Sequence, residues 1–273
     1  MIMSAKLKLS GVAFGLVVAT VASGAWTASP GWSTGSYDDR LQAIRRSAPA
    51  NAVALEEFLS VPPASAGVSS GELNALKNEA GMTLLALPQL PEALAGRFLA
   101  LAGNADTDPV WRDYCVQFLG MGFPRWSAAD KKAVAAFLVD VARKGRGATG
   151  GTALIALCNN VNAPEIDQER VQQLALTAVK DASYGDAGRI SALQVCARLN
   201  VKAALPEARS LAFSSATLRS SAIATIGALG DLSDEAALRV WAKSTDPSIR
   251  VPAVAALKRI EDRFSGSGIG VRL

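Results

Sequence analysis

A six-residue motif occurs twice in this chain and constrains its fold more than any other feature. Thr107–Arg112 reads TDPVWR, and Thr245–Arg250 reads TDPSIR. In each copy the aspartate, Asp108 or Asp246, suits a helix N-cap, where a carboxylate accepts hydrogen bonds from free backbone N–H groups. The proline that follows suits the first helical position, where a missing N–H costs nothing. Each copy therefore predicts the start of a helix, and the recurrence indicates a repeated structural unit.

The arginine that closes the motif begins a frame that also recurs between the two copies. A small residue stands three positions after it and a core residue seven after it, so that both share one helical face. The frame starts at Arg112, Gly150, Arg189, Arg219 and Arg250, with Lys77 and, more faintly, Arg40 upstream. The successive steps are 38, 39, 30 and 31 residues. Periods in this range are typical of arrays of stacked helices.

A second apolar run with helical periodicity lies between successive frame starts, for example AADKKAVAAFLVDVARK and QERVQQLALTAVK. Each repeat is therefore predicted to hold a first helix, A, which carries the frame, and a second helix, B. Aromatic residues make up only 6% of the chain, and the apolar content rests on Ala, Leu and Val, which favours helix over strand. We expect an all-α fold of stacked antiparallel helix pairs. The frame arginines should point along the stack, reach acidic caps and form a ladder between repeats.

This pattern resembles the HEAT-repeat family, in particular short bacterial HEAT-like repeats. The resemblance rests on Asp246, Pro247, Arg250, Ala253 and Leu257 and on their counterparts in earlier units, and it covers roughly residues 70–264. It implies an α-solenoid (an alpha-alpha superhelix, HEAT/ARM-like) whose B helices line a concave face. It also implies binding of other macromolecules, without indicating which.

The chain departs from the family pattern in three places. Gly150 replaces the arginine, the later steps are short, and Pro252 lies inside an expected A helix, where it should kink or disturb the first turns.

The amino terminus has the layout of a secretory signal peptide. Two lysines precede an uncharged apolar run, and a small-x-small pattern ends at Ala25. The apolar run is short for a membrane span, although an uncleaved anchor remains the alternative. We expect a periplasmic or secreted protein. The predicted organisation is a signal peptide over 1–25, a linker over 26–36, helical repeats over 37–264 and a flexible tail over 265–273.

Charge and composition argue against several classes of function. The 28 basic and 24 acidic side chains give a net charge of +4, and they are scattered, whereas a nucleic-acid partner would favour a clustered basic footprint. The chain has no histidine, which removes the commonest general base and the commonest transition-metal ligand. The GWSTG stretch around Ser33 therefore lacks the base that a nucleophilic serine needs. We expect no catalytic residue, no metal and no cofactor.

The stretch Phe123–Trp126, FPRW, is the first candidate for partner binding. Phe123, Arg125 and Trp126 form an aromatic pair around a cation, a composition typical of binding hot spots. The alternative is that the two rings pack over the joint between helices while Ser127 caps the next helix together with Asp130.

The stretch GRGATG (145–150) is the second candidate. Its glycines are suited to ending one helix and opening the next, and Lys144 and Arg146 stand beside the expected helix start. Cations at a helix N-terminus favour an anionic group.

The favoured function is an exported scaffold that binds a protein or peptide partner without catalysis of its own. The alternative is an accessory or lyase-like enzyme that holds a small molecule in a groove of the helical array. The three cysteines occupy expected core positions on helices, and a disulfide between Cys158 and Cys196 stays open.

Overall fold

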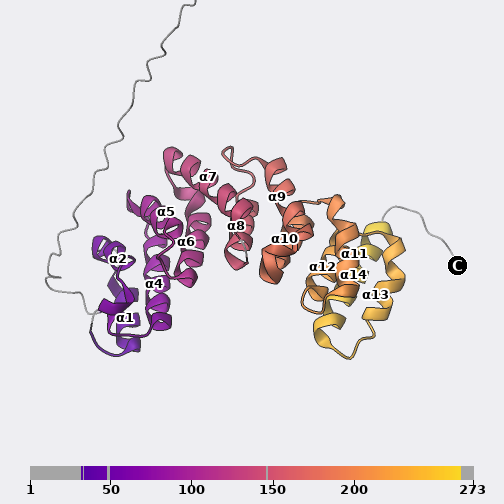
Figure 1. The fold of residues 1–273 in the computed structure, drawn as a ribbon, viewed down its shortest axis with the longest axis horizontal. Coiled ribbons are helices and arrows are strands. Elements are labelled where there is room, and N and C mark those ends of the chain that lie inside the picture. The colour runs from indigo at the N-terminus through magenta and orange to yellow at the C-terminus, as the bar shows by residue number, and fades with distance from the viewer. Residues whose placement is uncertain (1–31, 33, 48–49, 146, 266–273) are drawn as a thin grey trace, which may run out of the picture.

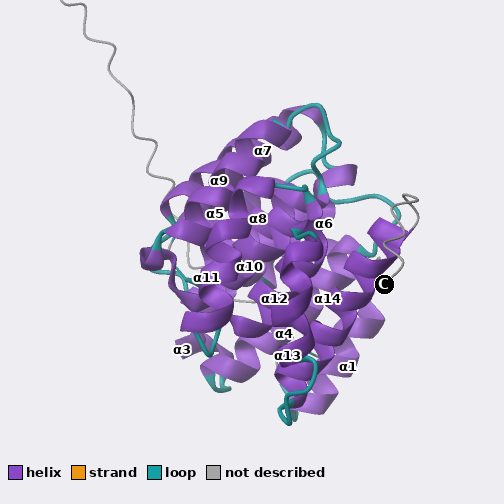
Figure 2. Ribbon diagram, turned by 90° about the vertical axis from the view of Figure 1, so that its right-hand side faces the viewer, coloured by secondary structure: helices purple, strands orange, loops and turns teal. Residues whose placement is uncertain are grey.

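The structure is a computed structural model that describes residues 32, 34–47, 50–145 and 147–265. Helices and loops account for all of these residues, and no strand occurs among them (Figure 2), which confirms the predicted all-α class. The expected signal peptide, Ser33, Arg146 and residues 266–273 of the expected tail lie outside the described residues. None of the helices in the described ranges has both the length and the apolar character needed to cross a membrane.

The described α-helices follow one another along an arch (Figure 1). They are α1 (Tyr37–Ser47), α2 (Ala52–Phe58), α3 (Pro63–Ala66), α4 (Ser70–Leu85), α5 (Leu94–Gly103), α6 (Pro109–Gly122), α7 (Ala128–Lys144), α8 (Ala148–Asn159), α9 (Gln168–Lys180), α10 (Gly185–Arg198), α11 (Leu205–Ser214), α12 (Arg219–Leu229), α13 (Glu235–Trp241) and α14 (Pro247–Ser265). Short 3-10 turns lie at η1 (Phe123–Arg125), η2 (Ala182–Tyr184), η3 (Lys202–Ala204) and η4 (Leu232–Asp234). The A helices are α1, α4, α6, α8, α10, α12 and α14, and the B helices are α2, α5, α7, α9, α11 and α13.

Both copies of the TDPxxR motif begin a helix as predicted. The Asp108 carboxylate accepts hydrogen bonds from the backbone N–H groups of Val110 at 2.9 Å and Trp111 at 3.1 Å. The Asp246 carboxylate accepts one from the N–H of Ser248 at 2.8 Å. The proline after each aspartate is the first residue of its helix, and α14 continues as one helix through Pro252.

The A helices form a continuous row, because each packs against the next from α1 to α14. Successive B helices touch one another much less, and beyond α9 they are in marginal contact at most. In Figure 1, α5, α7 and α9 lie along the outer edge of the arch, and α6, α8 and α10 lie nearer its hollow side. The expectation that B helices line the concave side is therefore wrong: the more closely spaced A helices lie inside the curve.

Small residues explain the close spacing of the A helices. A Cβ added to Gly120 of α6 would lie 2.5 Å from the Cβ of Ala156 in α8, and one added to Gly227 of α12 would lie 2.6 Å from that of Ala256 in α14. Each glycine stands eight positions after its frame start, and each alanine six after the next start. Equivalent positions thus meet in the middle of the row, between α6 and α8, and at its carboxyl-terminal end, between α12 and α14, as a repeated unit requires.

Each B helix packs most extensively against the A helix that follows it, not against the one before. Frame arginines reinforce two of these pairs. Arg189 donates from Nε to the Val179 carbonyl at 2.9 Å, near the end of α9, and Arg219 donates to the Ala212 carbonyl at 2.9 Å, near the end of α11. Arginine stabilises these otherwise unpaired carbonyls. The compact pair is therefore B followed by A, one helix out of phase with the predicted unit.

The segment expected to be a linker contributes to the core. Trp32 is only 1% exposed, and its carbonyl accepts a 2.5 Å hydrogen bond from Nε of Arg40 in α1. Arg40 also donates to the Ala66 carbonyl at 3.0 Å, and burial lowers the pKa of its guanidinium. The large apolar ring of Trp32 gains more from burial than the small residues around it, which explains why composition alone indicated a linker.

Candidate binding surface around helix α7

The aromatic residues of FPRW are buried, so packing is their role. Phe123 is 1% exposed and Trp126 is 5% exposed, and the Trp126 indole donates to the Leu119 carbonyl at 2.9 Å. Arg125 turns back onto the end of α4. Its guanidinium donates to the carbonyls of Leu85 at 2.5 Å, Leu87, and Pro88 at 3.0 Å.

The burial of Phe123 and Trp126 favours the packing alternative for these two rings, whereas Arg125 is exposed but donates to three carbonyls of its own chain. Ser127 begins α7 as expected: its hydroxyl accepts a hydrogen bond from the Asp130 N–H at 3.1 Å and donates to the Asp130 carboxylate at 2.6 Å.

The glycines of GRGATG end α7 and begin α8, as predicted. Gly145 follows the last residue of α7, and Gly147, with φ of +73°, is the N-cap of α8 and supplies no side-chain cap. Gly147 is held in place by a 2.8 Å hydrogen bond from its N–H to the Tyr184 carbonyl. Lys144 is exposed and forms a 2.9 Å ion pair with Asp140, whereas Arg146 lies outside the described residues.

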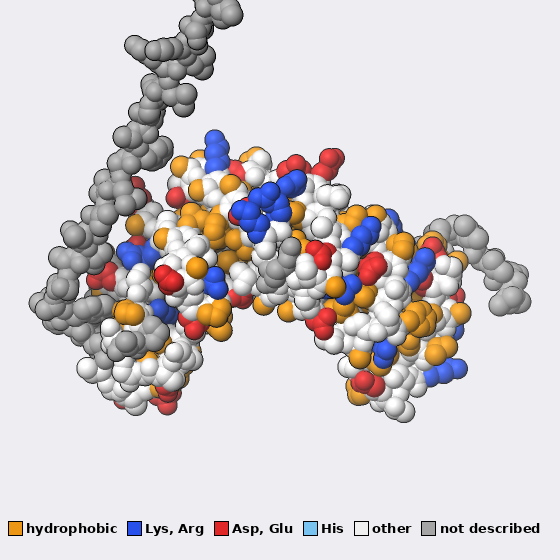
Figure 3. All heavy atoms as spheres, viewed as in Figure 1, with side chains coloured by type: hydrophobic (Ala, Val, Ile, Leu, Met, Phe, Trp, Pro, Cys, Tyr) orange, Lys and Arg blue, Asp and Glu red, His pale blue; other side chains and the backbone are white. Residues whose placement is uncertain are grey.

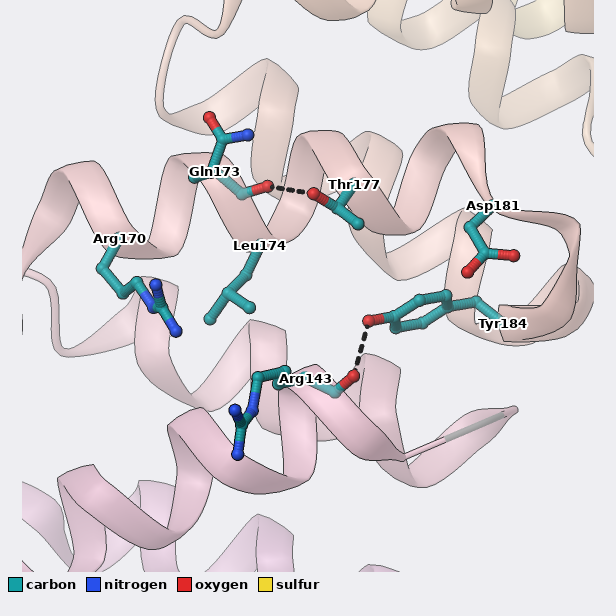
Figure 4. A pocket seen from close by; sticks show the side chains of 7 residues that line it. All are labelled: Arg143, Arg170, Gln173, Leu174, Thr177, Asp181 and Tyr184. Atoms are coloured by element: carbon teal, nitrogen blue, oxygen red, sulfur yellow. Dashed lines mark hydrogen bonds between the residues drawn. The ribbon is translucent and has the colours of Figure 1, made fainter.

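A hollow of about 250 Å³ lies between the carboxyl-terminal half of α7 and helix α9 (Figure 4). Arg143 approaches it from α7, Arg170 from α9, and Leu174 lies between them. Tyr184 fixes the two sides, since its hydroxyl donates to the carbonyls of Ala142 at 3.1 Å and Arg143 at 3.0 Å. The remaining lining residues are Gln173, Thr177 and Asp181.

A second hollow of about 370 Å³ lies on the opposite flank of α7, against α5, α6 and the start of α8. Lys144 and Asp140 line it from α7, Arg112 from α6 and Thr149 from α8. Hydrogen bonds from Arg143 at 2.7 Å and from Lys144 lower the pKa of the Asp140 carboxyl. Asp140 is therefore a carboxylate that is already engaged by two cations.

Basic side chains gather over this part of the arch, between α7 and α9 (Figure 3). Arg143 and Lys144 keep 54% and 66% of their side chains exposed, and Arg170 is exposed as well. Sequence reasoning identified Lys144 as a binding candidate and Arg112 as a frame arginine, but it missed Arg143 and Arg170. Arg143 adjoins Lys144 in the sequence and was open to the same inference, but the approach of Arg170 depends on how α9 packs beside α7.

Lys77 is a cation with a strongly lowered pKa, and it lies inside the protein. It is 5% exposed, its ammonium lies 5.4 Å from the centre of the Trp111 ring, and burial lowers its pKa to about 8. The nearby charge of Asp108 opposes this shift. Lys77 lines none of the hollows described above, so its environment points to a structural position on α4.

The cysteines are buried and free. Cys115, Cys158 and Cys196 form no disulfide, and burial raises the pKa of Cys115 and of Cys196 to about 12. Among the described residues, no cluster of three or more His, Cys, Asp or Glu side chains is arranged to hold a metal ion.

Comparison with known proteins gives no family assignment. No protein-family model matches the chain, and a search of curated proteins found no significant match.

Proposed function

We propose that this chain is an exported α-solenoid of HEAT-like repeats that binds a protein or peptide partner and has no catalytic activity of its own. The recurrent frame and the row of A helices support a repeat array, and a repeat array offers an extended surface on a rigid support. The amino-terminal sequence pattern supports export.

The observation that carries the proposal is the basic surface around α7. Arg143, Lys144 and Arg170 are exposed beside two hollows, and the helices beneath them are fixed by packing and by the Tyr184 hydrogen bonds. Exposed cations beside concave surfaces attract acidic groups and increase the rate of encounter with a complementary partner. An acidic stretch on the partner is the chemistry that this surface fits.

The test is affinity capture from extracytoplasmic extract with residues 26–273 as bait. The variant Arg143→Glu/Lys144→Glu/Arg170→Glu reverses the charge of the surface around α7. Capture of a stoichiometric protein should be lost, and capture by the unchanged chain should weaken as salt rises.

The matched control is Arg239→Glu/Lys258→Glu/Arg259→Glu, which makes the same charge change on exposed positions of α13 and α14. It should retain capture. Equal loss in both variants would indicate a diffuse charge effect, and turnover of an added metabolite without any protein capture would remove the scaffold proposal.

A further inference from the structure

Three arginines at the frame position share one hydrogen-bonding pattern, with which Arg112 can be compared. Arg189, Arg219 and Arg250 each donate to backbone carbonyls at or just beyond the end of the preceding B helix. For Arg250 the acceptors are the carbonyls of Ser244 at 2.9 Å and Thr245 at 3.1 Å. Arg189 adds a 3.1 Å ion pair with Glu207. Each of these guanidinium groups is thus satisfied by the protein itself.

Arg112 occupies the same frame position and departs from this pattern. Across the part of the chain that the structure describes, its guanidinium makes no hydrogen bond or ion pair, and its Nε atom is buried without a partner. A buried N–H group of a cation that loses water and gains no acceptor is costly. Arg112 therefore has donor capacity that the helix ends in its own repeat do not use.

Arg112 lines the hollow of about 370 Å³, so a ligand bound there could accept hydrogen bonds from it. Ala102 and Gly103 line the hollow from the end of α5, the place that corresponds to the carbonyls bound by Arg189 and Arg219 near the ends of α9 and α11. Lys144 and Thr149 line it from α7 and α8. The first turn of α8 has no side-chain cap, so its N–H groups remain donors. A hollow of this volume can hold a small functional group together with water molecules.

The charge of the lining selects the ligand class. Asp140 is already paired with Lys144 and with Arg143, so among the described lining residues Arg112 is the one cation without a carboxylate partner. A carboxylate, with one negative charge and a planar pair of oxygens, matches both this single unpaired charge and the fork of a guanidinium. A phosphate would bring close to two negative charges toward Asp140.

We propose that this cavity binds one carboxylate group, with Arg112 donating to its oxygens and Lys144 and the start of α8 completing the site. The carboxylate belongs either to a small organic acid or to an acidic residue of a peptide. Only the peptide case rests on the proposed scaffold function. No bond is formed or broken.

The experiment follows the arginine Nε–H signals of ¹⁵N-labelled protein by NMR while propionate or a blocked alanine pentapeptide with one central glutamate is added. The Arg112 signal should shift in a saturable way, and the glutamine version of the peptide should leave it unmoved. Arg112→Met should weaken binding at least tenfold, measured by calorimetry. Arg219→Met, the same substitution at the same frame position, should keep the affinity.

Thermal unfolding separates a ligand-binding role from a structural one. Arg112→Met should leave the midpoint unchanged or raise it, because it removes a buried donor that has no acceptor. Arg219→Met should lower the midpoint by several degrees, because it loses its carbonyl partners. Arg112→Lys keeps the positive charge but lacks the planar pair of guanidinium donors. It replaces Arg112→Met in the binding measurements if the methionine variant fails to fold.

The outcomes separate cleanly. Binding of propionate alone assigns a small-acid site and leaves the scaffold proposal to its own test, whereas binding of the glutamate peptide supports both. No saturable shift with either probe, or equal destabilisation by Arg112→Met and Arg219→Met, overturns the proposal and leaves a hydrated structural arginine.

Discussion

Gly227 of α12 lies directly against Ala256 of α14, so close that a Cβ on Gly227 would stand 2.6 Å from both the Cα and the Cβ of Ala256. The contact joins two A helices at equivalent frame positions, and Gly120 and Ala156 repeat it between α6 and α8. The A helices approach closely because these positions carry almost no side chain. This approach places them on the inner side of the arch and so determines the direction of its curvature.

Gly227→Ala is therefore expected to destabilise the fold by about 1–3 kcal/mol, because the added methyl meets backbone that has to move. Urea denaturation monitored by circular dichroism measures the change. Gly96→Ala in α5 is the matched control, since a Cβ there meets nothing within 4 Å. It should stabilise by about 0.5–1 kcal/mol through helix propensity. Equal effects of the two substitutions would contradict the close contact.

Arg125 is expected to stabilise the fold rather than bind a partner. Arg125→Met removes the donors to three carbonyls after α4 and should cost about 2 kcal/mol in the free energy of unfolding. Arg170→Met removes an exposed guanidinium and should change stability by less than about 0.5 kcal/mol. If chemical denaturation gave both variants wild-type stability, the carbonyl contacts of Arg125 would be incidental.

Lys77 should make stability rise with pH in the alkaline range. Its pKa is about 8 in the folded protein against 10.5 for an unperturbed lysine, so between these two values the unfolded chain binds more protons than the native protein. The free energy of unfolding should therefore increase from pH 7 to pH 9, by about 1 kcal/mol from this group. Below pH 8 Lys77 is protonated in both states, and this gain is absent.

Lys77→Met isolates that effect, because it keeps the length of the side chain and removes the titration. Cys115 and Cys196 act in the opposite direction, since burial raises the pKa of each thiol to about 12 and stability falls once unfolded thiols ionise near pH 9. The difference between wild type and variant in urea denaturation at each pH cancels the cysteine contribution. A difference that does not vary with pH would show that Lys77 titrates normally.

The cysteines should react only after unfolding. Cys115, Cys158 and Cys196 are buried thiols, and burial raises the pKa of each, so iodoacetamide should leave the native protein unmodified and alkylate three sites in denaturant. Mass spectrometry of the unreduced protein checks the same point. Loss of two hydrogens on joined peptides that contain Cys158 and Cys196 would show a disulfide instead.

Local sequence determined where several helices begin. Asp108 and Asp246 define helix starts within three residues of themselves, and Gly145 and Gly147 separate α7 from α8. The recurrence of the arginine frame also located the A helices. These features were predictable because capping, proline geometry and helical periodicity depend on neighbours along the chain.

Tertiary structure alone decided which layer is inner, which helices pair and where the candidate site lies. The curvature depends on Gly120 and Gly227 meeting Ala156 and Ala256 of the next A helix, and the pairing depends on how each B helix packs against the A helix that follows it. Whether Arg112 finds a carbonyl of the preceding helix is likewise settled by packing, although its motif is the same as that of Arg250. The type of a side chain determines which groups it can bond to. Which groups it meets is determined by how helices from neighbouring repeats, about 30 to 40 residues apart in the sequence, pack against each other.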